Sequence, residues 1–122
     1  MTAQSPDPAR SHARAQTIAG LRALADYLEA NPAVPIAEPG GEYNIIADHG
    51  DDATERAEID SIAAVLGEPV YDETADYGHY WVTKVFGRIT YRATHIPVRQ
   101  RATYRALDDL ARSVHEIYTA DQ

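Results

Sequence analysis

The chain contains no cysteine and no long hydrophobic run. Without cysteine it cannot form a disulfide, hold zinc through thiolates or use a thiol nucleophile. No apolar stretch approaches the roughly 20 residues that a membrane-spanning helix needs. The first ten residues also lack the hydrophobic segment of a secretory signal. From these absences we expect a cytoplasmic protein with no membrane partner.

Familiar catalytic and cofactor motifs are missing as well. None of the serines lies in a GxSxG turn, and no glycine-rich phosphate loop is present. The five histidines include no pair at i and i+4 and no HExxH motif, which are the patterns of helical zinc sites. The sequence therefore favours a non-enzymatic protein and predicts no cofactor and no metal centre.

What is present is the composition of an ordinary globular domain, with 44% hydrophobic and 25% charged residues in a chain of 122. Residues 1–9 carry Ser, Pro and Asp without apolar periodicity, so we predict a disordered tail there. The remaining residues, 10–122, are predicted to form a single domain.

Hydrophobic periodicity predicts the elements of that domain. Apolar residues at spacings of three and four indicate helices, and aromatic and β-branched runs indicate strands. The predicted helices cover residues 10–30, 53–66 and 99–118, and the predicted strands cover 42–47, 70–71, 79–86 and 89–96. The order is α-β-α-β-β-β-α. We expect a two-layer α+β fold, in which a small, mostly antiparallel sheet with a central β-hairpin carries helices on one face.

Two local features add detail to this fold. The last helix carries Leu107, Leu110, Val114 and Ile117 at spacings of three and four, and we expect this stripe to pack onto the sheet.

Residues 48–52, Asp-His-Gly-Asp-Asp, form a turn before the second helix. They could hold a divalent cation through oxygen ligands. The favoured interpretation is a helix start, in which Asp52 is the N-cap and the residue at 55, a glutamate, completes a capping box.

Charge is distributed unevenly along the chain, whose net charge is −8. Residues 26–76 include fourteen acids and only one arginine, whereas residues 81–107 include six cations and no acid. Such asymmetry predicts either opposed acidic and basic surfaces or pairing between the two regions.

The hairpin places part of this positive charge on one face. Even-numbered residues from 88 to 94 should point to one side of the second strand, and odd-numbered residues to the other. The first set is polar and basic, and we expect Lys84 of the partner strand to join it. The candidate residues for binding a partner are Lys84, Arg88, Tyr91, Arg92, Arg99, Arg101 and Arg105.

The same hairpin suggests a possible histidine pair. A turn centred on Gly87 would place His79 opposite His95 on the neighbouring strand. Two adjacent imidazoles resemble a small acid–base site, which together with the acids near residue 48 would suit a hydrolase. A structural histidine pair at the end of a sheet is the alternative interpretation.

Three segments of the chain carry a resemblance. LRALADYLEANPAVPI, ERAEIDSIAAVLGEPV and GHYWVTKVFGRITYRATHIP resemble, in the same order, a group of small uncharacterised proteins of actinobacteria and their phages. That group has no known activity, so no residue inherits a role from it. The resemblance implies an accessory or host-interaction protein of phage or mobile-element origin.

Three functional hypotheses follow from these observations. The leading one is a non-enzymatic interaction protein that binds a protein partner, or itself as a homodimer, through its segregated charges. The second is nucleic-acid binding by the Arg- and Tyr-rich hairpin. The third is a small hydrolase with a His/Asp site.

Overall fold

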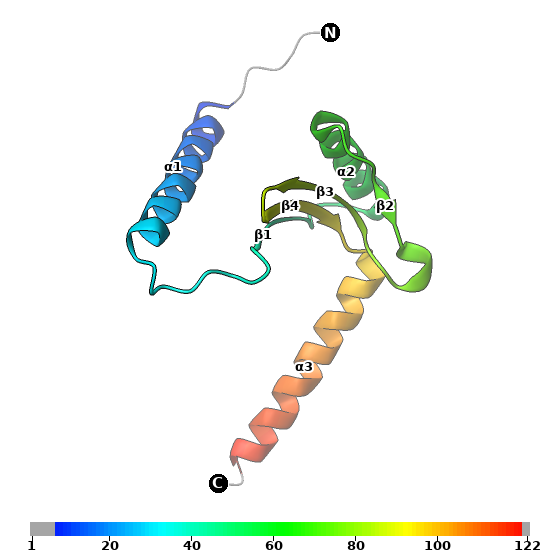
Figure 1. Cartoon of the computed structure of the whole chain (residues 1–122). Coiled ribbons are helices and arrows are strands. Elements are labelled where there is room, and N and C mark those ends of the chain that lie inside the picture. The colour runs from blue at the N-terminus through cyan, green and yellow to red at the C-terminus, as the bar shows by residue number, and fades with distance from the viewer. Residues whose placement is uncertain (1–6, 121–122) are drawn as a thin grey trace. The chain divides into compact units, whose positions relative to one another are not determined.

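The structure, a computed structural model, describes residues 7–120. Its elements are α1 (Pro8–Ala30), β1 (Glu42–Ala47), α2 (Asp52–Leu66), β2 (Tyr71–Asp72), a 3-10 turn η1 (Thr74–Asp76), β3 (Tyr80–Phe86), β4 (Ile89–His95) and α3 (Val98–Ala120) (Figure 1). The predicted α+β class and the order α-β-α-β-β-β-α are confirmed. Most of the tail predicted over residues 1–9 lies outside the described residues, but its last two residues belong to α1.

The chain divides into two units, residues 1–38 and 39–122. In the first unit the side chain of Asp7 caps α1 by accepting a hydrogen bond from the backbone N–H of Ala9. Pro8 occupies the first turn, where a missing N–H costs nothing. The helix ends at Ala30, with Asn31 as its C-cap, because the residue before Pro32 avoids the α region. The prediction of one domain over residues 10–122 stays a prediction.

The second unit is built on a four-stranded sheet of order β1-β4-β3-β2. β1 pairs with β4 in parallel, and β4–β3 and β3–β2 are antiparallel. The carboxyl ends of β1 and β4 therefore lie at the same edge of the sheet, where α2 and α3 both begin. This edge is where distant parts of the sequence meet.

α2 covers one face of the sheet and forms the core with it. The core side chains are Ala47, Ile59, Ala63, Val82 and Ala93. The N-cap of α2 is Asp51, not Asp52 as predicted, and its carboxylate accepts a hydrogen bond of 2.7 Å from the N–H of Thr54. Hydrogen bonding from the backbone and the side chain of Thr54 holds the pKa of Asp51 below its ordinary value. The predicted capping box is absent because Glu55 turns inward, as described below.

The hairpin register differs from the prediction by one residue. Phe86 pairs with Ile89, so the turn is a two-residue loop whose first residue, Gly87, has a φ of 61°. Glycine is favoured in that left-handed conformation. The turn is therefore centred after Gly87 rather than on it, and His95 faces Tyr80. The predicted cross-strand pair of His79 and His95 is wrong for this reason.

The face of the sheet opposite α2, here called the open face, has no helix of residues 39–122 packed against it. By the observed register its members are Glu42, Asn44, Ile46, Tyr71, Trp81, Thr83, Val85, Thr90, Arg92 and Thr94. The prediction that α3 packs on the sheet is wrong. Every residue from 102 to 117 is exposed, because the helix runs past the end of the sheet after its first turn (Figure 1).

Candidate interaction surface

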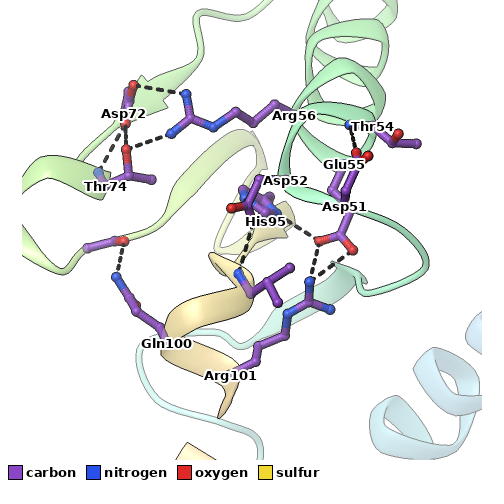
Figure 2. A network of polar contacts seen from close by, with 12 residues as sticks. Asp51, Asp52, Thr54, Glu55, Arg56, Asp72, Thr74, His95, Gln100 and Arg101 are labelled. Carbon is purple, nitrogen blue, oxygen red and sulfur yellow. Dashed lines mark hydrogen bonds and ion pairs between the residues drawn. The ribbon is translucent and has the colours of Figure 1, made fainter. Parts of the chain in front are cut away.

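A buried polar cluster fixes the beginning of α3. The carboxylate of Glu55, on α2, and the imidazole of His95, at the end of β4, have no exposed surface, and His95 Nδ1 lies 2.8 Å from Glu55 Oε1. Arg101 reaches the same carboxylate from α3, with its Nη2 atom donating to both oxygens at 3.0 Å (Figure 2). Three elements thus share one buried anion, and its charge is balanced by the guanidinium.

Two more contacts complete this junction. The N–H of Val98 donates to Asp52 Oδ1 at 2.9 Å, which satisfies one of the free donors at the start of α3. The side-chain amide of Gln100 donates to the carbonyl of Gly78 at 3.0 Å. The first turn of α3 is therefore tied both to α2 and to the segment before β3, as Figure 2 shows.

The geometry of the cluster suits a structural role, holding the first turn of α3, rather than acid–base catalysis. A general acid or base must come within hydrogen-bonding distance of a substrate. Glu55 and His95 are fully buried, so a substrate does not reach them in this structure. The second ring nitrogen of His95 lies 3.4 Å from Asp52 Oδ1 and makes no well-aligned hydrogen bond. With His79 not opposite His95, the hydrolase hypothesis loses the pair on which it was built.

Lys84 lies on the side of the sheet that α2 covers, not on the basic face predicted for it. Its cross-strand neighbour is Tyr91, and both side chains point toward α2. The ammonium group donates to the carbonyl of Leu66, the last residue of α2, at 3.0 Å and lies 3.8 Å from Glu68. A cation at a helix C-terminus stabilises the helix dipole, so Lys84 has a local structural role. The one-residue shift of the hairpin turn explains the error.

Most of the other predicted cations are also engaged within the chain. Arg88 Nε donates to the carbonyl of Pro39 at 3.0 Å. Arg101 belongs to the buried cluster, and its side chain is 21% exposed. The guanidinium of Arg99 lies over the ring of Tyr77, 5.6 Å from its centre. Arg105 is exposed on α3. Only part of the predicted positive surface is therefore open to a partner.

Arg92 is the cation that the open face displays. Its guanidinium lies 4.9 Å from the ring centre of Trp81, and its Nε donates to Thr94 Oγ1. Trp81 in turn stacks against Tyr71 with ring centres 5.4 Å apart. Tyr91, predicted in the same group, points the other way and stacks on Tyr43 beside the core. The alternation predicted for β4 is thus correct, with Arg92 on the polar side and Tyr91 on the packed side.

The single arginine of residues 26–76 is paired within that same acidic region. Arg56, on α2, donates to Thr74 Oγ1 at 2.8 Å and lies 3.9 Å from Asp72. Hydrogen bonds from Thr74 hold the pKa of Asp72 below its ordinary value, with a smaller effect from Arg56. On the neighbouring strand, the hydroxyl of Tyr80 donates to Asp60, which raises the Tyr80 pKa to about 12.

The turn at residues 48–52, considered as a cation site, does not bring its oxygen ligands together. In residues 7–120 no group of three or more His, Asp or Glu side chains is placed to hold a metal ion. His49 instead forms an exposed contact of 3.1 Å with Asp48. None of the helices in this part of the chain combines the length and the apolar character needed to cross a membrane.

The helix α3 carries an apolar stripe that residues 39–122 leave uncovered. Its members keep between 44% and 65% of their surface exposed: Tyr104, Leu107, Leu110, Val114 and Ile117. The 3-4 spacing of the last four was evident from the sequence, but the surface against which they pack was predicted wrongly. We define this set as the α3 stripe.

Comparison with protein-family models, with curated proteins and with solved structures found no match for this chain.

Proposed function

We propose that this protein is a non-enzymatic interaction module that binds a protein partner, another copy of itself included, through the α3 stripe. One observation carries the proposal: sixteen consecutive residues, 102–117, form a helix in which every residue is exposed and large apolar side chains lie on one side. Exposed apolar surfaces of this kind are typical of protein–protein interaction sites.

Helix energetics support this conclusion. An isolated helix of fewer than about 12–15 residues is marginal in water, and most helical stability in proteins comes from packing an apolar face. Beyond its first turn α3 has no such packing within residues 39–122. Burying a side chain such as Leu110 contributes about 1.5–3 kcal/mol. A partner that covers the stripe would therefore stabilise α3 as well as bind it.

Charge has a secondary part in this proposal. The sequence suggested segregated acidic and basic surfaces, but Lys84, Arg88 and Arg101 make contacts within the chain. The resemblance to small actinobacterial and phage proteins supports an accessory role, in which a protein acts by binding rather than by catalysis. We accordingly infer a phage or mobile-element accessory protein that acts in the cytoplasm.

The test is to purify a tagged chain from the host that carries it and to identify the proteins that accompany it. In one variant Leu110→Ser and Val114→Ser remove the centre of the stripe. The matched control carries Arg105→Ser and Arg112→Ser, which lie on the opposite side of the same helix. We expect the partner to be lost with the first pair and retained with the second. A partner set that is identical in both variants, or absent from the wild type, would refute the proposal.

A nucleic-acid role has narrower support. Arg92 over Trp81 on an exposed sheet resembles surfaces that stack bases and contact phosphates. The net charge of −8 opposes binding to a polyanion. A gel-shift assay with single-stranded DNA and RNA at low salt separates the two functions, because only nucleic-acid binding requires Arg92 and falls steeply as salt rises.

A further inference from the structure

We propose that the partner of the α3 stripe is a helix with one acidic residue, and that this residue docks in a pocket between Tyr77 and the first two turns of α3. This inference rests on the proposed function and specifies the chemistry of its partner. The pocket, here called the Tyr77 pocket, has a volume of about 200 Å³ and is lined by Tyr77, Arg99, Gln100, Thr103 and Tyr104. Pockets that hold whole small molecules measure about 300–1,000 Å³, so this one is suited to a single side chain.

The Tyr77 pocket lies in line with the α3 stripe. Residues three and four apart share one face of a helix. Two residues that line the pocket begin a run at alternating spacings of three and four, which continues through the stripe: Gln100, Thr103, Leu107, Leu110, Val114, Ile117. This is the spacing with which one helix packs along another. A single partner helix can therefore cover the stripe and reach the pocket.

Arg99 is the one charged residue beside this run. The positions that border the run on its two sides are residues 99, 104, 106, 111 and 113, and only the first of them is charged. Among residues 7–117, no carboxylate lies within 4.0 Å of the Arg99 guanidinium, which rests over the ring of Tyr77. The acids Asp108 and Asp109 lie on the far side of α3. A carboxylate of the partner is therefore attracted to the pocket end of the helix, where the guanidinium and two phenol groups can donate hydrogen bonds to it.

The backbone of Tyr77 points to a binding role for its side chain. Its φ is 61°, and it is the one residue other than glycine with a positive φ in the part of the chain that the structure describes. This left-handed conformation is unfavourable for residues with a Cβ atom, and such residues cluster at binding sites. The side chain is 78% exposed, so packing in the core does not account for a tyrosine at this position.

The Tyr77 pocket is held in place by contacts within the chain. Gln100 is 5% exposed, and its side-chain amide donates to the carbonyl of Gly78, the residue after Tyr77, at 3.0 Å. The N–H of Gly78 donates to the carbonyl of Glu73 at 2.8 Å, which closes the turn that carries Tyr77. A site that is already formed loses little conformational entropy on binding. Tyrosine and arginine are also the residue types that contribute most to binding at protein interfaces.

The test uses three synthetic helical peptides of about 15 residues, the length that spans the run at 1.5 Å per residue. All three carry leucine at alternating spacings of three and four. One has a single glutamate in its first turn, another has it in its last turn, and the third has glutamine at both places. The two acidic peptides cover both directions in which the partner helix can lie. Calorimetry measures their binding to the wild type, to Arg99→Gln, to Leu110→Ser and to the control Arg105→Gln, which lies on the opposite side of α3.

We expect one acidic peptide to bind the wild type about ten-fold more tightly than the glutamine peptide, the effect of one hydrogen bond to a charged group. This difference should disappear in Arg99→Gln and remain in Arg105→Gln, and Leu110→Ser should weaken all three peptides. Equal affinities of the three peptides for the wild type would overturn the acidic anchor. If Leu110→Ser still weakened them, the proposed function would stand without it.

Other outcomes would overturn the proposal in different ways. If no peptide binds, the partner is not a helix of this kind, and the purification experiment alone decides the proposed function. If sedimentation equilibrium shows a dimer of the wild type that Leu110→Ser dissociates, the stripe is covered by a second copy. Peptide binding that is unchanged by Leu110→Ser would contradict the proposed function itself.

Tyr77→Gly separates a binding role from a structural one. Glycine adopts the left-handed conformation without strain, so this variant should leave the midpoint of urea unfolding unchanged or raise it. The same variant should weaken the preferred acidic peptide by about ten-fold, because the pocket loses one wall. A lower unfolding midpoint together with unchanged peptide affinity would show that Tyr77 serves the fold, and would overturn the proposal.

Discussion

Replacing Arg101 by methionine should destabilise the protein, because the Glu55 carboxylate would remain buried without its cation. Removal of one partner from a buried ion pair costs about 3–5 kcal/mol. Arg101 is 21% exposed, and His95 still contacts the carboxylate at 2.8 Å, so part of the interaction survives. We therefore expect a loss of about 2–3 kcal/mol, or a roughly 30- to 150-fold larger unfolding constant.

The assay is urea unfolding followed by the fluorescence of Trp81. A double-mutant cycle with Glu55→Gln separates the ion pair from other effects of each substitution. The protein with both Arg101→Met and Glu55→Gln has no buried charge, so its loss should be smaller than the sum of the single losses. Arg105→Met, on the exposed part of α3, is the control and should change stability by less than about 0.5 kcal/mol.

Two results would contradict this reasoning. One is a loss below about 0.5 kcal/mol for Arg101→Met, since the carboxylate would then find another partner or water. The other is strict additivity in the cycle, which would mean that Glu55 and Arg101 do not interact in solution. Either result would also remove the anchor that fixes the direction of α3.

Three further predictions concern the core, a tyrosine and the glycines. Ile59→Ala should lower the free energy of unfolding by about 2–5 kcal/mol in the urea assay, because Ile59 is fully buried in the core. The Tyr80 pKa of about 12 lies above the ordinary value of 10, so stability should fall as pH rises from 10 to 12. Asp60→Asn should return the phenol titration, followed by absorbance, toward 10. Gly40→Ala should destabilise the protein, since a Cβ atom there would lie 1.8 Å from a hairpin-loop carbonyl oxygen. In the same unfolding assay Gly20→Ala, in open space on α1, should be neutral or stabilising by up to about 1 kcal/mol.

The secondary structure was largely predictable because hydrophobic periodicity is a local property. The strand from 42 to 47 has the predicted bounds, and the second helix begins one residue earlier than predicted. The alternation along β4 was also correct, since side chains on a strand point to opposite faces in turn. A one-residue change in the hairpin turn was enough to move Lys84 to the other face, because the period of a strand is two.

The buried cluster could not be predicted, because its members are far apart in the sequence. Glu55 is separated by 40 residues from His95 and by 46 from Arg101. In the sequence Glu55 fits a capping box as well as a buried anion, and nothing local distinguishes the two. The α3 stripe shows a related limit: periodicity identifies an apolar face but does not identify the surface that covers it.

The distribution of charge along the chain has a different meaning once the chain is folded. Arg56 with Asp72, Lys84 with Glu68 and Arg101 with Glu55 bring cations and acids together at 3.9, 3.8 and 3.0 Å. In the last two pairs a cation from residues 81–107 meets an acid from residues 26–76, so folding itself neutralises part of the asymmetry. The α3 stripe that the fold leaves uncovered is apolar, whereas the open face mixes apolar side chains with polar ones. A partner selected by these surfaces is held chiefly by hydrophobic burial, and the few exposed charges align it rather than attract it from a distance.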